Sequence, residues 1–530
     1  MTTPYTITTA ISYPNGRPHI GHAYEAIATD AFARFQRMMG RDVFFQTGTD
    51  EHGLKMAQAA RARGVQPLAL ADEMSSYFKE MDDKLNVSYD RFIRTSEPAH
   101  HRASQALWKA MEANGDLYLD RYDGWYSVRD EAYYDEKELT DGEGGQKLSP
   151  QGTPVEWTVE ESWFFRLSKY QQPLLDLYNT QSDFIRPDSR RNEIMRFVEG
   201  GLSDLSISRT SFDWGVKVPG DSKGGANHVM YVWVDALTNY LTGCGYPDDL
   251  DRMAHYWADG ADITHIIGKD IVRFHAVYWP AFLMSAQLPL PKQIFGHGFL
   301  LNRGEKMSKS VGNVADPLEL ADAFGVDQLR YFLLAEVTFG NDGSYSPEAI
   351  VQRANSDLAN SFGNLAQRTL SFIAKNLDGR LPTFTGEPLQ DITTGERMAL
   401  QLTGCFVDDM QELNLSHAIE TWMRAVFACN QYIDAEAPWA LRKTDPAKME
   451  SVLATLYVAI GQLAIAIRPV IPASADALLD QMGVPVAVRT YKGLATDWYS
   501  DLVSSGFTLS PPKPLFPRLD LPASAEPNAA

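Results

Sequence analysis

The sequence predicts an α/β protein in which a parallel-sheet domain is split by an insertion and followed by an all-helical domain. Strand and helix patterns alternate over residues 1–65, the alternation stops over 116–219 and then resumes, and the chain after 316 is helical nearly throughout. Strands that alternate with helices form parallel sheets with crossover connections. The predicted units are the first half of the sheet domain at 1–115, the insertion at 116–219, the second half at 220–315, a linking helical region at 316–355, a helical domain at 356–509 and a proline-rich tail at 510–530.

Length and composition are those of a soluble globular protein. The 530 residues suffice for roughly two to four domains, and the apolar (44%) and charged (22%) fractions are ordinary. No charged and then apolar leader opens the sequence. Cys244, Cys405 and Cys429 lie too far apart for a disulfide framework or a zinc pattern. These features predict a cytoplasmic location, where thiols stay reduced.

Charge and hydropathy limit the partners. A net charge of −20 argues against non-specific nucleic-acid binding by the whole surface, although a local basic patch could still bind phosphates. The most apolar run, 452–467, contains Gln462, ends at Arg468 and Pro469, and is short for a bilayer-spanning helix. We predict a buried helix there and no membrane partner.

The first elements are a strand, a turn and a helix. "YTITTAI" alternates as a strand does, and Pro14, Asn15 and Gly16 form a tight turn before a helix that stops at Gly40. "DVFFQTG" is a second strand, and "HGLKMAQAARARG" is a helix that ends on Gly64.

The insertion and the second half of the sheet domain follow. Short aromatic strands, "GWYSVRDEAYYD" and "VEWTVEESWFFRL", flank a stretch predicted to be flexible, "TDGEGGQKLSPQGTP". "ITHIIGKD" is then a strand that leads into the helix "IVRFHAVYWPAFLMSAQ", and "QIFGHGFLLNRGEKMSKSVG" is a strand followed by a Gly/Ser/Lys loop. Beyond 316, segments such as "SHAIETWMRAVFACNQYI" are amphipathic helices. The tail from Ser510, with six prolines, should lie extended over a surface.

Two histidines, His19 and His22, occur where the first helix begins. Helix N-termini at the carboxyl ends of parallel strands bind anions, and residues three apart share one helix face, so both imidazoles can donate to one phosphate. Pro18 fixes φ at the helix entry, and Gly21 leaves room for a flat group against the backbone. The alternative is that both are ordinary capping and surface histidines.

A second cluster, "KMSKS", follows the last predicted strand. Lys306 and Lys309 on a Gly-flanked loop form a positive clamp suited to phosphate. Taken alone, such a loop is more often an ordinary solvated one.

"HIGH" in the first strand–helix turn together with "KMSKS" after the last strand resembles the class I aminoacyl-tRNA synthetases. The resemblance implies a Rossmann-like catalytic domain followed by a helical-bundle anticodon-binding domain. It also implies that ATP, with Mg²⁺, is held while an amino-acid carboxylate attacks its α-phosphorus. The implied catalytic residues are His19, His22, Lys306 and Lys309, and the implied ATP contacts are these four with Gly21, Gly268, Asp270, Met307 and Ser308.

Other stretches resemble methionyl-tRNA synthetases along nearly the whole chain: "AISYPNGRPHIGH", "GTDEHG", "YVWVDALTNY", "IIGKDIVRFHAVYWPAFL", "NLAQR" and "EAPW". A methionine pocket must rely on shape, aromatic contact and polarizability. By this resemblance Asp50 binds the substrate ammonium and Arg209 lies near Asp50. The full implied set is Ile11, Tyr13, Asp50, Arg209, Trp233, Ala236, Leu237, Tyr240, Ile271 and His275. Trp233, Leu237, Ile271 and His275 would be plain core residues if seen alone.

The helical domain carries the implied RNA contacts. Asn364 and Arg368 are four residues apart on one helix face, and Trp439 is expected just after a helix that Pro438 ends. Unpaired bases are read by edge hydrogen bonds and by stacking on aromatic rings. The resemblance implies that these three residues read the anticodon of elongator and initiator tRNA(Met). An exposed Asn/Arg face with a half-buried Trp is the alternative.

The sequence also departs from many methionyl enzymes. Residues 116–219 contain no Cys and no His, so we predict no structural zinc. The insertion is also shorter than the hydrolytic editing domains of the isoleucine, valine and leucine enzymes. No additional RNA-binding module follows the tail, which favours a monomer. The remaining alternatives are a cysteine or leucine ligase, a plain nucleotidyltransferase and a non-catalytic tRNA-binding scaffold.

Overall fold

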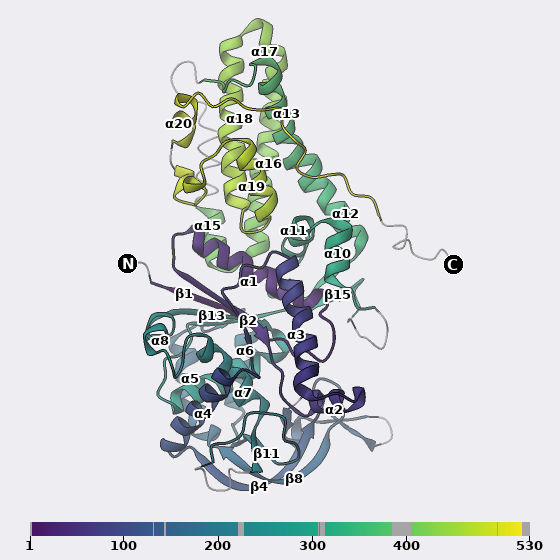
Figure 1. The fold of residues 1–530 in the computed structure, drawn as a ribbon, viewed down its shortest axis with the longest axis vertical. Coiled ribbons are helices and arrows are strands. Elements are labelled where there is room, and N and C mark those ends of the chain that lie inside the picture. The colour runs from purple at the N-terminus through teal and green to yellow at the C-terminus, as the bar shows by residue number, and fades with distance from the viewer. Residues whose placement is uncertain are drawn as a thin grey trace, which may run out of the picture.

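The computed structural model describes residues 3–130, 132–142, 145–220, 227–305, 307, 313–383, 404–495 and 497–521. The molecule is elongated, with a helical domain above a sheet domain and the sheet of the insertion at the opposite end (Figure 1). Helix α1 (Ile20–Met38) lies between the two domains and is buried on nearly every side. The helix that begins with the two histidines therefore contacts both halves of the protein.

A six-stranded parallel sheet forms the centre of the lower domain. Its order is β3 (Arg91–Arg94), β2 (Val43–Thr49), β1 (Tyr5–Thr9), β13 (Asp262–Gly268), β14 (Gln293–His297) and β9 (Ile185–Arg186). The chain builds outward from β1 to β3 and later returns to β13 on the other side of β1, with Tyr5 opposite both Val43 and Asp262. The strand order thus reverses between β1 and β13, and ligands of such sheets bind above that point. The predicted split α/β domain is confirmed.

The insertion has its own antiparallel sheet, in the order β10 (Leu205–Ser206), β8 (Glu156–Phe165), β4 (Leu117–Ser127) and β5 (Ala132–Tyr134). The stretch predicted to be flexible contains a small hairpin among its described residues, β6 (Thr140–Asp141) with β7 (Lys147–Leu148). Strand β9 lies within 116–219 yet pairs in parallel with β14, Ile185 opposite Ile294. The insertion therefore supplies an edge strand to the central sheet.

Five polar side chains stabilise the turns of the insertion. The carboxylate of Asp130 accepts hydrogen bonds from Ser149 (2.6 Å), Tyr134 (3.0 Å) and Thr153. Ser127 Oγ lies 2.8 Å from Thr153 Oγ1 and also accepts from the Asp130 N–H at 3.1 Å. Ser127, Ser149 and Thr153 are buried. Since a buried hydroxyl costs free energy unless it is paired, this cluster accounts for the order of a segment that has no thiol or imidazole.

Helices cover the sheet and link it to the insertion. They are α2 (Leu54–Arg63), α3 (Pro67–Lys84), α4 (Pro98–Ala113), α5 (Gln171–Thr180), α6 (Asp188–Glu199), α7 (Val232–Gly243), α8 (Leu250–Tyr256) and α9 (Trp279–Ser285), with short turns η1 (Glu136–Glu138) and η3 (Leu167–Tyr170). Two short pairs complete this half: β11 (Ser208–Arg209) with β12 (Val229–Met230), and β15 (Leu300–Asn302) with β16 (Gly343–Tyr345).

The helix predicted after β13 is interrupted. A 3₁₀ turn, η5 (Lys269–Ile271), is followed by a π-helical segment, η6 (Phe274–Tyr278), and only then by α9. Pro280 has no N–H with which to bond the carbonyl of Ala276, so a regular helix cannot continue there. The Tyr178 hydroxyl donates to that carbonyl instead, at 2.6 Å. The interruption lies in the segment predicted to carry Ile271 and His275.

The upper domain consists of helices: α10 (Pro317–Phe324), α11 (Val326–Glu336), α12 (Pro347–Arg353), the π-helical η7 (Ala354–Gly363), α13 (Asn364–Asn376), α15 (Cys405–Gln411), α16 (Leu415–Glu436), α17 (Pro438–Thr444), α18 (Pro446–Ile467), α19 (Pro472–Gln481) and α20 (Trp498–Ser504), with short turns η8 (Val486–Val488) and η9 (Gly493–Ala495). Within the described ranges, α18 alone has the length and composition to cross a membrane, and 78% of its most apolar window is buried in the bundle. The prediction of a buried helix is confirmed. The described part of the tail is extended and bonded at Lys513 and Leu519 to the helices beneath it, as predicted.

Arg330 of α11 joins the two domains. It is fully buried and forms an ion pair of 2.6 Å with Asp30 of α1. Its guanidinium also donates to the carbonyls of Leu85 (3.1 Å), Pro469 (3.0 Å) and Val470 (2.9 Å). Five donors in a rigid fork suit Arg to such a junction. One side chain thus ties α1 and the end of α3 to the connection between α18 and α19.

Candidate active site

The start of α1 is closed by its two histidines. His19 is the N-cap: its Nδ1 accepts the Gly21 N–H at 3.1 Å, and Nδ1 of His22 accepts the His19 N–H at 3.1 Å. The two rings lie 3.8 Å apart. Because each Nδ1 accepts a hydrogen bond, the proton of each neutral imidazole is on Nε2, which is then a donor. The histidines do cap the helix, and the cap itself sets the tautomer that an anion-binding pair needs.

Gly21 is required by the packing of the first ring. A Cβ at this position would lie 2.9 Å from Cε1 of His19. The imidazole of His19 therefore lies close against this glycine. Any other residue would push that ring out of its capping position.

Met307 is the described residue of the KMSKS motif, whereas Lys306, Ser308 and Lys309 lie outside the described residues. Met307 packs against the core cluster that includes α1. Beyond the motif, the carbonyl of Ala315 accepts the N–H of Ile20, the first residue of α1, at 3.0 Å. Asn302, before the motif, is bonded to the carbonyl of Asn313 at 2.7 Å. Both ends of the lysine loop are thus fixed beside the histidine helix.

The ends of β1 and β2 bring together three of the residues predicted to bind methionine. The N–H of Ser12 donates to the carbonyl of Gly48 at 2.9 Å, and the N–H of Asp50 donates back to the carbonyl of Ser12 at 2.9 Å. Ile11 and Tyr13 flank Ser12, and the Tyr13 hydroxyl accepts the N–H of Met56 at 2.9 Å. Ile11, Tyr13 and Asp50 therefore share the edge where the strand order reverses.

An aromatic group from α7 and the interrupted helix forms the wall of the site. The ring of Trp233 stacks on Phe274 with centroids 3.8 Å apart and an angle of 8°. Tyr240 and His275 are buried, and the Tyr240 hydroxyl lies 2.7 Å from Nε2 of His275. Nδ1 of His275 donates to the carbonyl of Ile271 at 3.0 Å. Burial lowers the pKa of His275 to about 4, so its ring is neutral and Nε2 accepts the tyrosine proton. Ala236 and Leu237 are buried on the same helix.

Sequence reasoning missed two members of this wall, Phe274 and His265. Tyr240 stacks on His265 of β13 with centroids 4.1 Å apart, and Nδ1 of His265 lies 2.8 Å from the Thr8 hydroxyl of β1. This contact anchors Tyr240 to the two central strands. Burial lowers the pKa of His265 well below its usual range. The sequence feature that could have indicated His265 is the occurrence of a histidine in the mostly apolar strand "ITHIIG".

Arg209 lies in β11, within the segment predicted as the insertion. It is buried, pairs with Glu160 at 2.5 Å, and its guanidinium lies 4.3 Å from the centre of the Tyr126 ring. Its strand, β11, pairs with β12 immediately before α7. Trp214, just beyond, donates Nε1–H to the carbonyl of Glu51 at 2.6 Å, next to Asp50. The structure thus places the strand of Arg209 beside β12, which leads into α7, and the guanidinium pairs with Glu160 of β8.

Gly268 and Asp270 lie at the end of β13. A Cβ at Gly268 would lie 2.7 Å from the carboxylate of Asp270, so this glycine allows the carboxylate to fold back over the strand end. The neighbouring Lys269 pairs with Asp342 at 2.7 Å. A cavity of about 440 Å³ lies between this segment and the turns of the insertion at Tyr134 and Gln151.

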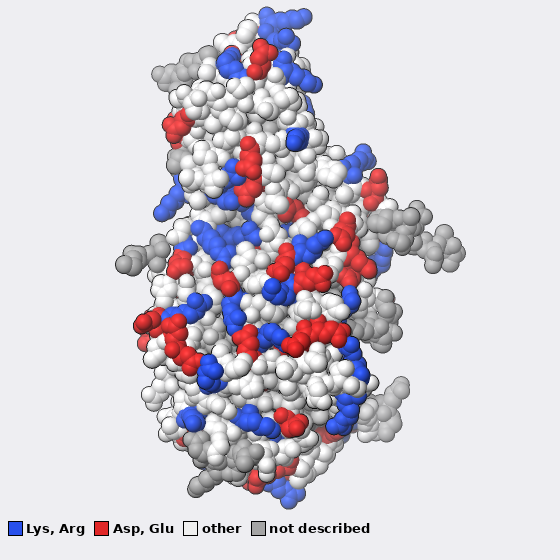
Figure 2. Space-filling model, in the orientation of Figure 1, with Lys and Arg blue, Asp and Glu red and all other residues white. Residues whose placement is uncertain are grey.

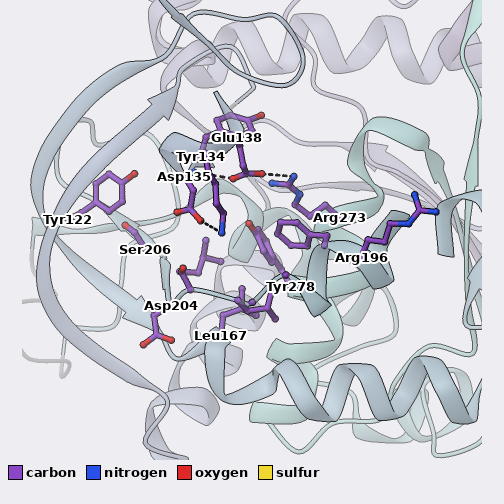
Figure 3. Close-up of a pocket in the computed structure, with 17 residues that line it drawn as sticks. Tyr122, Tyr134, Asp135, Glu138, Leu167, Arg196, Asp204, Ser206, Arg273 and Tyr278 are labelled. Atoms are coloured by element: carbon purple, nitrogen blue, oxygen red, sulfur yellow. Dashed lines mark hydrogen bonds and ion pairs between the residues drawn. The ribbon is translucent and has the colours of Figure 1, made fainter. Parts of the chain in front are cut away.

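A second cavity, of about 300 Å³, is lined by Arg273 and Tyr278 of the interrupted helix and by Tyr134 and Glu138 of the insertion (Figure 3). Arg273 forms an ion pair with Glu138 at 2.9 Å on one wall, and its guanidinium lies 4.1 Å from the centre of the Phe197 ring. Glu138 belongs to the insertion, so this pair joins the insertion to the wall of the site. Within the described ranges, no group of three or more His, Cys, Asp or Glu side chains is placed to hold a metal ion.

The residues predicted to read RNA lie at the tip of the helical domain. Arg368 of α13 pairs with Asp434 at 2.6 Å, and its guanidinium lies 5.3 Å from the centre of the Trp439 ring. Trp439 is 47% exposed, and Asn364 is exposed one turn before Arg368. The expectation that Pro438 ends a helix was wrong: α16 ends at Glu436, its cap residue Ala437 has a positive φ, and Pro438 begins α17, where proline needs no N–H. The exposed basic residues Arg442 and Lys443 end α17, and Figure 2 shows Lys and Arg side chains at this tip.

Comparison with known proteins agrees with this arrangement. The family model for class I tRNA synthetases (M) matches residues 5–370, and the model for the anticodon-binding domain of methionyl tRNA ligase matches residues 395–525. The methionine–tRNA ligase of Brucella suis is 58% identical over 97% of this chain and 98% of its own length. The methionine–tRNA ligase of Mycobacterium bovis is 54% identical over 99% of both chains.

Solved structures lead to the same group. The Mycobacterium tuberculosis methionyl-tRNA synthetase bound by methionyl-adenylate is 52% identical, covers 97% of this chain and 100% of its own, and superposes with a TM-score of 0.91. The free form of that enzyme superposes with a TM-score of 0.86 at 48% identity, covering 98% of this chain and 99% of its own. From the two matched family models and relatives this similar along their whole length, the chain belongs to the methionyl-tRNA synthetase family of class I aminoacyl-tRNA synthetases.

Proposed function

We propose that the chain is an active methionine–tRNA ligase. It joins methionine to ATP, releasing pyrophosphate, and then transfers the methionyl group from the adenylate to the terminal adenosine of tRNA(Met). The observation that carries this proposal is the meeting of two features at one sheet edge. A pair of imidazoles with Nε2–H donors lies at the start of α1, and the aromatic wall of Trp233, Tyr240 and His275 lies beside the ends of β1 and β13.

Activation needs positioned charge and no side-chain nucleophile. His19 and His22 donate from the helix start to the phosphates of ATP, which enters with Mg²⁺, while Lys306 and Lys309 close over them from the loop anchored at Ala315. Asp270 at the end of β13 is suited to the ribose. Negative charge grows on the phosphoryl oxygens as the methionine carboxylate attacks, so preorganised donors are strongest in the transition state.

Methionine recognition follows from the neutral aromatic wall. The Tyr240 hydroxyl donates to His275, so the side chain of the substrate meets rings and a tyrosine oxygen whose proton is already used. A thioether, which has only a weak acceptor and is polarizable, is suited to such a wall. Asp50, at the end of β2, binds the ammonium, and Arg209, on the strand beside β12, lies on the carboxylate side.

The tip of the helical domain reads the anticodon. Trp439 offers an exposed ring for stacking, and Arg368 and Asn364 present polar groups beside it. The basic end of α17 supplies the local positive charge that a chain of net charge −20 needs at an RNA site. Replacing Trp439 with Ala should raise KM for tRNA and leave methionine activation unchanged, and equal damage to both steps would contradict the anticodon role.

We also infer a cytoplasmic monomer without structural zinc. The Asp130 hydrogen-bond cluster supports the zinc-free insertion, because it fixes the turns with side chains alone. Dialysis against a zinc-selective chelator, followed by assay in excess Mg²⁺, should leave activity unchanged.

One experiment separates the alternatives. ATP–pyrophosphate exchange is measured with each of the twenty amino acids and with norleucine and homocysteine. We expect exchange with methionine and weaker exchange with the two analogues, because one methylene is worth only about 1–3 kcal/mol. Exchange with leucine or cysteine instead, or with no amino acid, would overturn the proposal. Complete rejection of both analogues would contradict the wall described here.

A further inference from the structure

The segment Asp50, Glu51 and His52 places three ionisable side chains in succession after β2, and each is almost fully buried. Asp50 is the residue suited to the substrate ammonium. Glu51 is held by Arg94 at 2.6 Å and by the hydroxyls of Ser75 and Ser96. The reaction needs neither Glu51 nor His52, yet both are buried beside the site.

His52 leads directly to the methionine wall. Its Nδ1 lies 2.6 Å from Oδ2 of Asp235, and His100 Nε2 lies 2.6 Å from Oδ1 of the same carboxylate. These three side chains are at most 2% exposed. Nδ1 of His100 also lies 3.0 Å from the Thr242 hydroxyl. His100 therefore contacts α7 at two positions two turns apart, and it fastens α4 along that helix.

We propose that Asp235 is a positioning residue of the methionine site: through His52 and His100 it sets the position of α7 relative to Asp50. Asp235 lies on α7 between Trp233 and Ala236, and His52 lies two residues after Asp50. The two ends of the substrate, its ammonium and its thioether, are bound by segments that this carboxylate joins. The inference rests on the proposed function, because it assigns a role within the same site.

The protonation states support a rigid clamp. Burial alone would raise the pKa of Asp235, but the charges and hydrogen bonds of His52 and His100 outweigh it and hold that pKa below its usual range. An ionised carboxylate accepts only, so His52 donates from Nδ1 and His100 donates from Nε2. Each oxygen thus has a directional partner from a different element, the β2 turn on one side and α4 on the other.

Asp235→Asn tests the hydrogen bonds that Asp235 accepts from His52 and His100, and it changes the shape of the side chain little. The amide can accept a hydrogen bond only on its oxygen, so it presents an N–H to one of the two histidines. We expect KM for methionine in pyrophosphate exchange to rise on the order of 10- to 100-fold, since small misplacements near a site have effects of this size. KM for ATP should stay unchanged. The control is Asp116→Asn, because Asp116 is an equally buried carboxylate with bonds to Ser285 and Tyr170 under the insertion. It should lower the melting temperature and leave both KM values unchanged.

A pair of histidine variants repeats the test without touching Asp235. His52→Asn retains an N–H near the Nδ1 position, whereas His52→Phe keeps the ring and loses the donor. We expect the asparagine variant to keep KM for methionine near the wild-type value and the phenylalanine variant to raise it. These two variants test the positioning role of Asp235 even if Asp235→Asn does not fold.

Two outcomes would overturn the inference. One is a melting-temperature loss in Asp235→Asn like that of Asp116→Asn with no selective rise in KM for methionine. The other is equal KM values for the two His52 variants. A wild-type chain that activates a different amino acid would refute the proposed function only, because the same KM ratios can be measured with that amino acid.

Discussion

At the residue scale, the two histidines of α1 show how the backbone assigns a chemical role. Each Nδ1 is occupied by a main-chain N–H, so the donor on each ring is fixed before any ligand arrives. The spacing of the two histidines at a helix start fitted either an anion site or ordinary capping, and the resemblance to class I synthetases favoured the anion site. The sequence could not predict the tautomer, which depends on the capping geometry.

His22→Gln should separate capping from catalysis. Glutamine at the third helical position can accept the His19 N–H through its side-chain oxygen, so the cap is kept and the melting temperature changes little. The Nε2–H at the phosphate is lost, and we expect kcat for pyrophosphate exchange to fall about 10²–10³-fold. A lower melting temperature with normal kcat would show that His22 acts as a cap only.

The sequence predicted three ring-bearing residues of the methionine site from their helical spacing and their family motifs: Trp233, Tyr240 and His275. The structure brings these three together. Their supports, Phe274, His265 and the pair His52–Asp235, were not predicted as part of the site. Their contacts join segments far apart in the chain, and a lone histidine in an apolar strand or a carboxylate within a helix gives no signal of its partner. Lys306 and Lys309 remain predictions, because the structure does not describe them.

At the element scale, the strands and most helices follow from periodicity, whereas the interruptions do not. Pro280 was visible in the sequence, but the interruption of the helix begins earlier, at Phe274. The carbonyl of Ala276, which cannot bond to Pro280, accepts a hydrogen bond from another donor. Tyr178, from the insertion, is that donor. Which distant hydroxyl fills such a position depends on tertiary packing.

Tyr178→Phe should leave the Ala276 carbonyl buried and unsatisfied. We expect a loss of about 1–3 kcal/mol in the free energy of unfolding, measured by urea denaturation. Adding Pro280→Ala in the same chain should recover part of this loss, because alanine restores the N–H that a helix uses at that point. If Pro280→Ala deepens the loss, the hydrogen bond is not the reason for the interruption.

His297 joins β14 to α1 and makes their contact depend on pH. Its Nδ1 donates to the carbonyl of Gly298 at 2.8 Å and its Nε2 to Glu25 at 2.8 Å, so both nitrogens carry protons. Burial alone would lower the pKa of His297, but the hydrogen bond and charge of Glu25 outweigh it and raise that pKa. A raised pKa contributes stability that is complete below the unfolded value of about 6.5 and is lost as the pH rises through the folded value.

Glu25→Gln is therefore expected to lower the melting temperature most at pH 6 and progressively less towards pH 9. Differential scanning calorimetry across this range measures the difference from wild type. The same substitution in a His297→Asn background should show no such trend. A difference that is constant with pH in the wild-type background would exclude a charged His297.

At the scale of the whole molecule, the split sheet domain and the helical domain were predicted, because each rests on many residues of one periodicity. How the domains meet was not predicted. Arg330 lies in an apolar helical stretch, and only the structure shows that it bonds Asp30 of α1 and the turn between α18 and α19. A single buried arginine thus connects α1 to the helical domain.

Arg330→Met should destabilise the chain by about 3–5 kcal/mol, because it leaves Asp30 without its principal buried partner. Combining it with Asp30→Asn should recover part of this loss. Thermal unfolding of the two variants tests the expectation, and additive losses would contradict it. If the junction also transmits tRNA binding, aminoacylation by Arg330→Met should fall further than pyrophosphate exchange.

Strand β9 has a consequence for any attempt to shorten this protein. The segment between the two halves of the sheet looks removable in the sequence, yet Ile185 and Arg186 cover the outer edge of β14. Excising 116–219 as a cassette would bare a row of main-chain donors and acceptors, and bare edges recruit strands from other molecules. A minimal version of the enzyme must therefore keep this two-residue edge strand, or it will precipitate before its activity can be assayed.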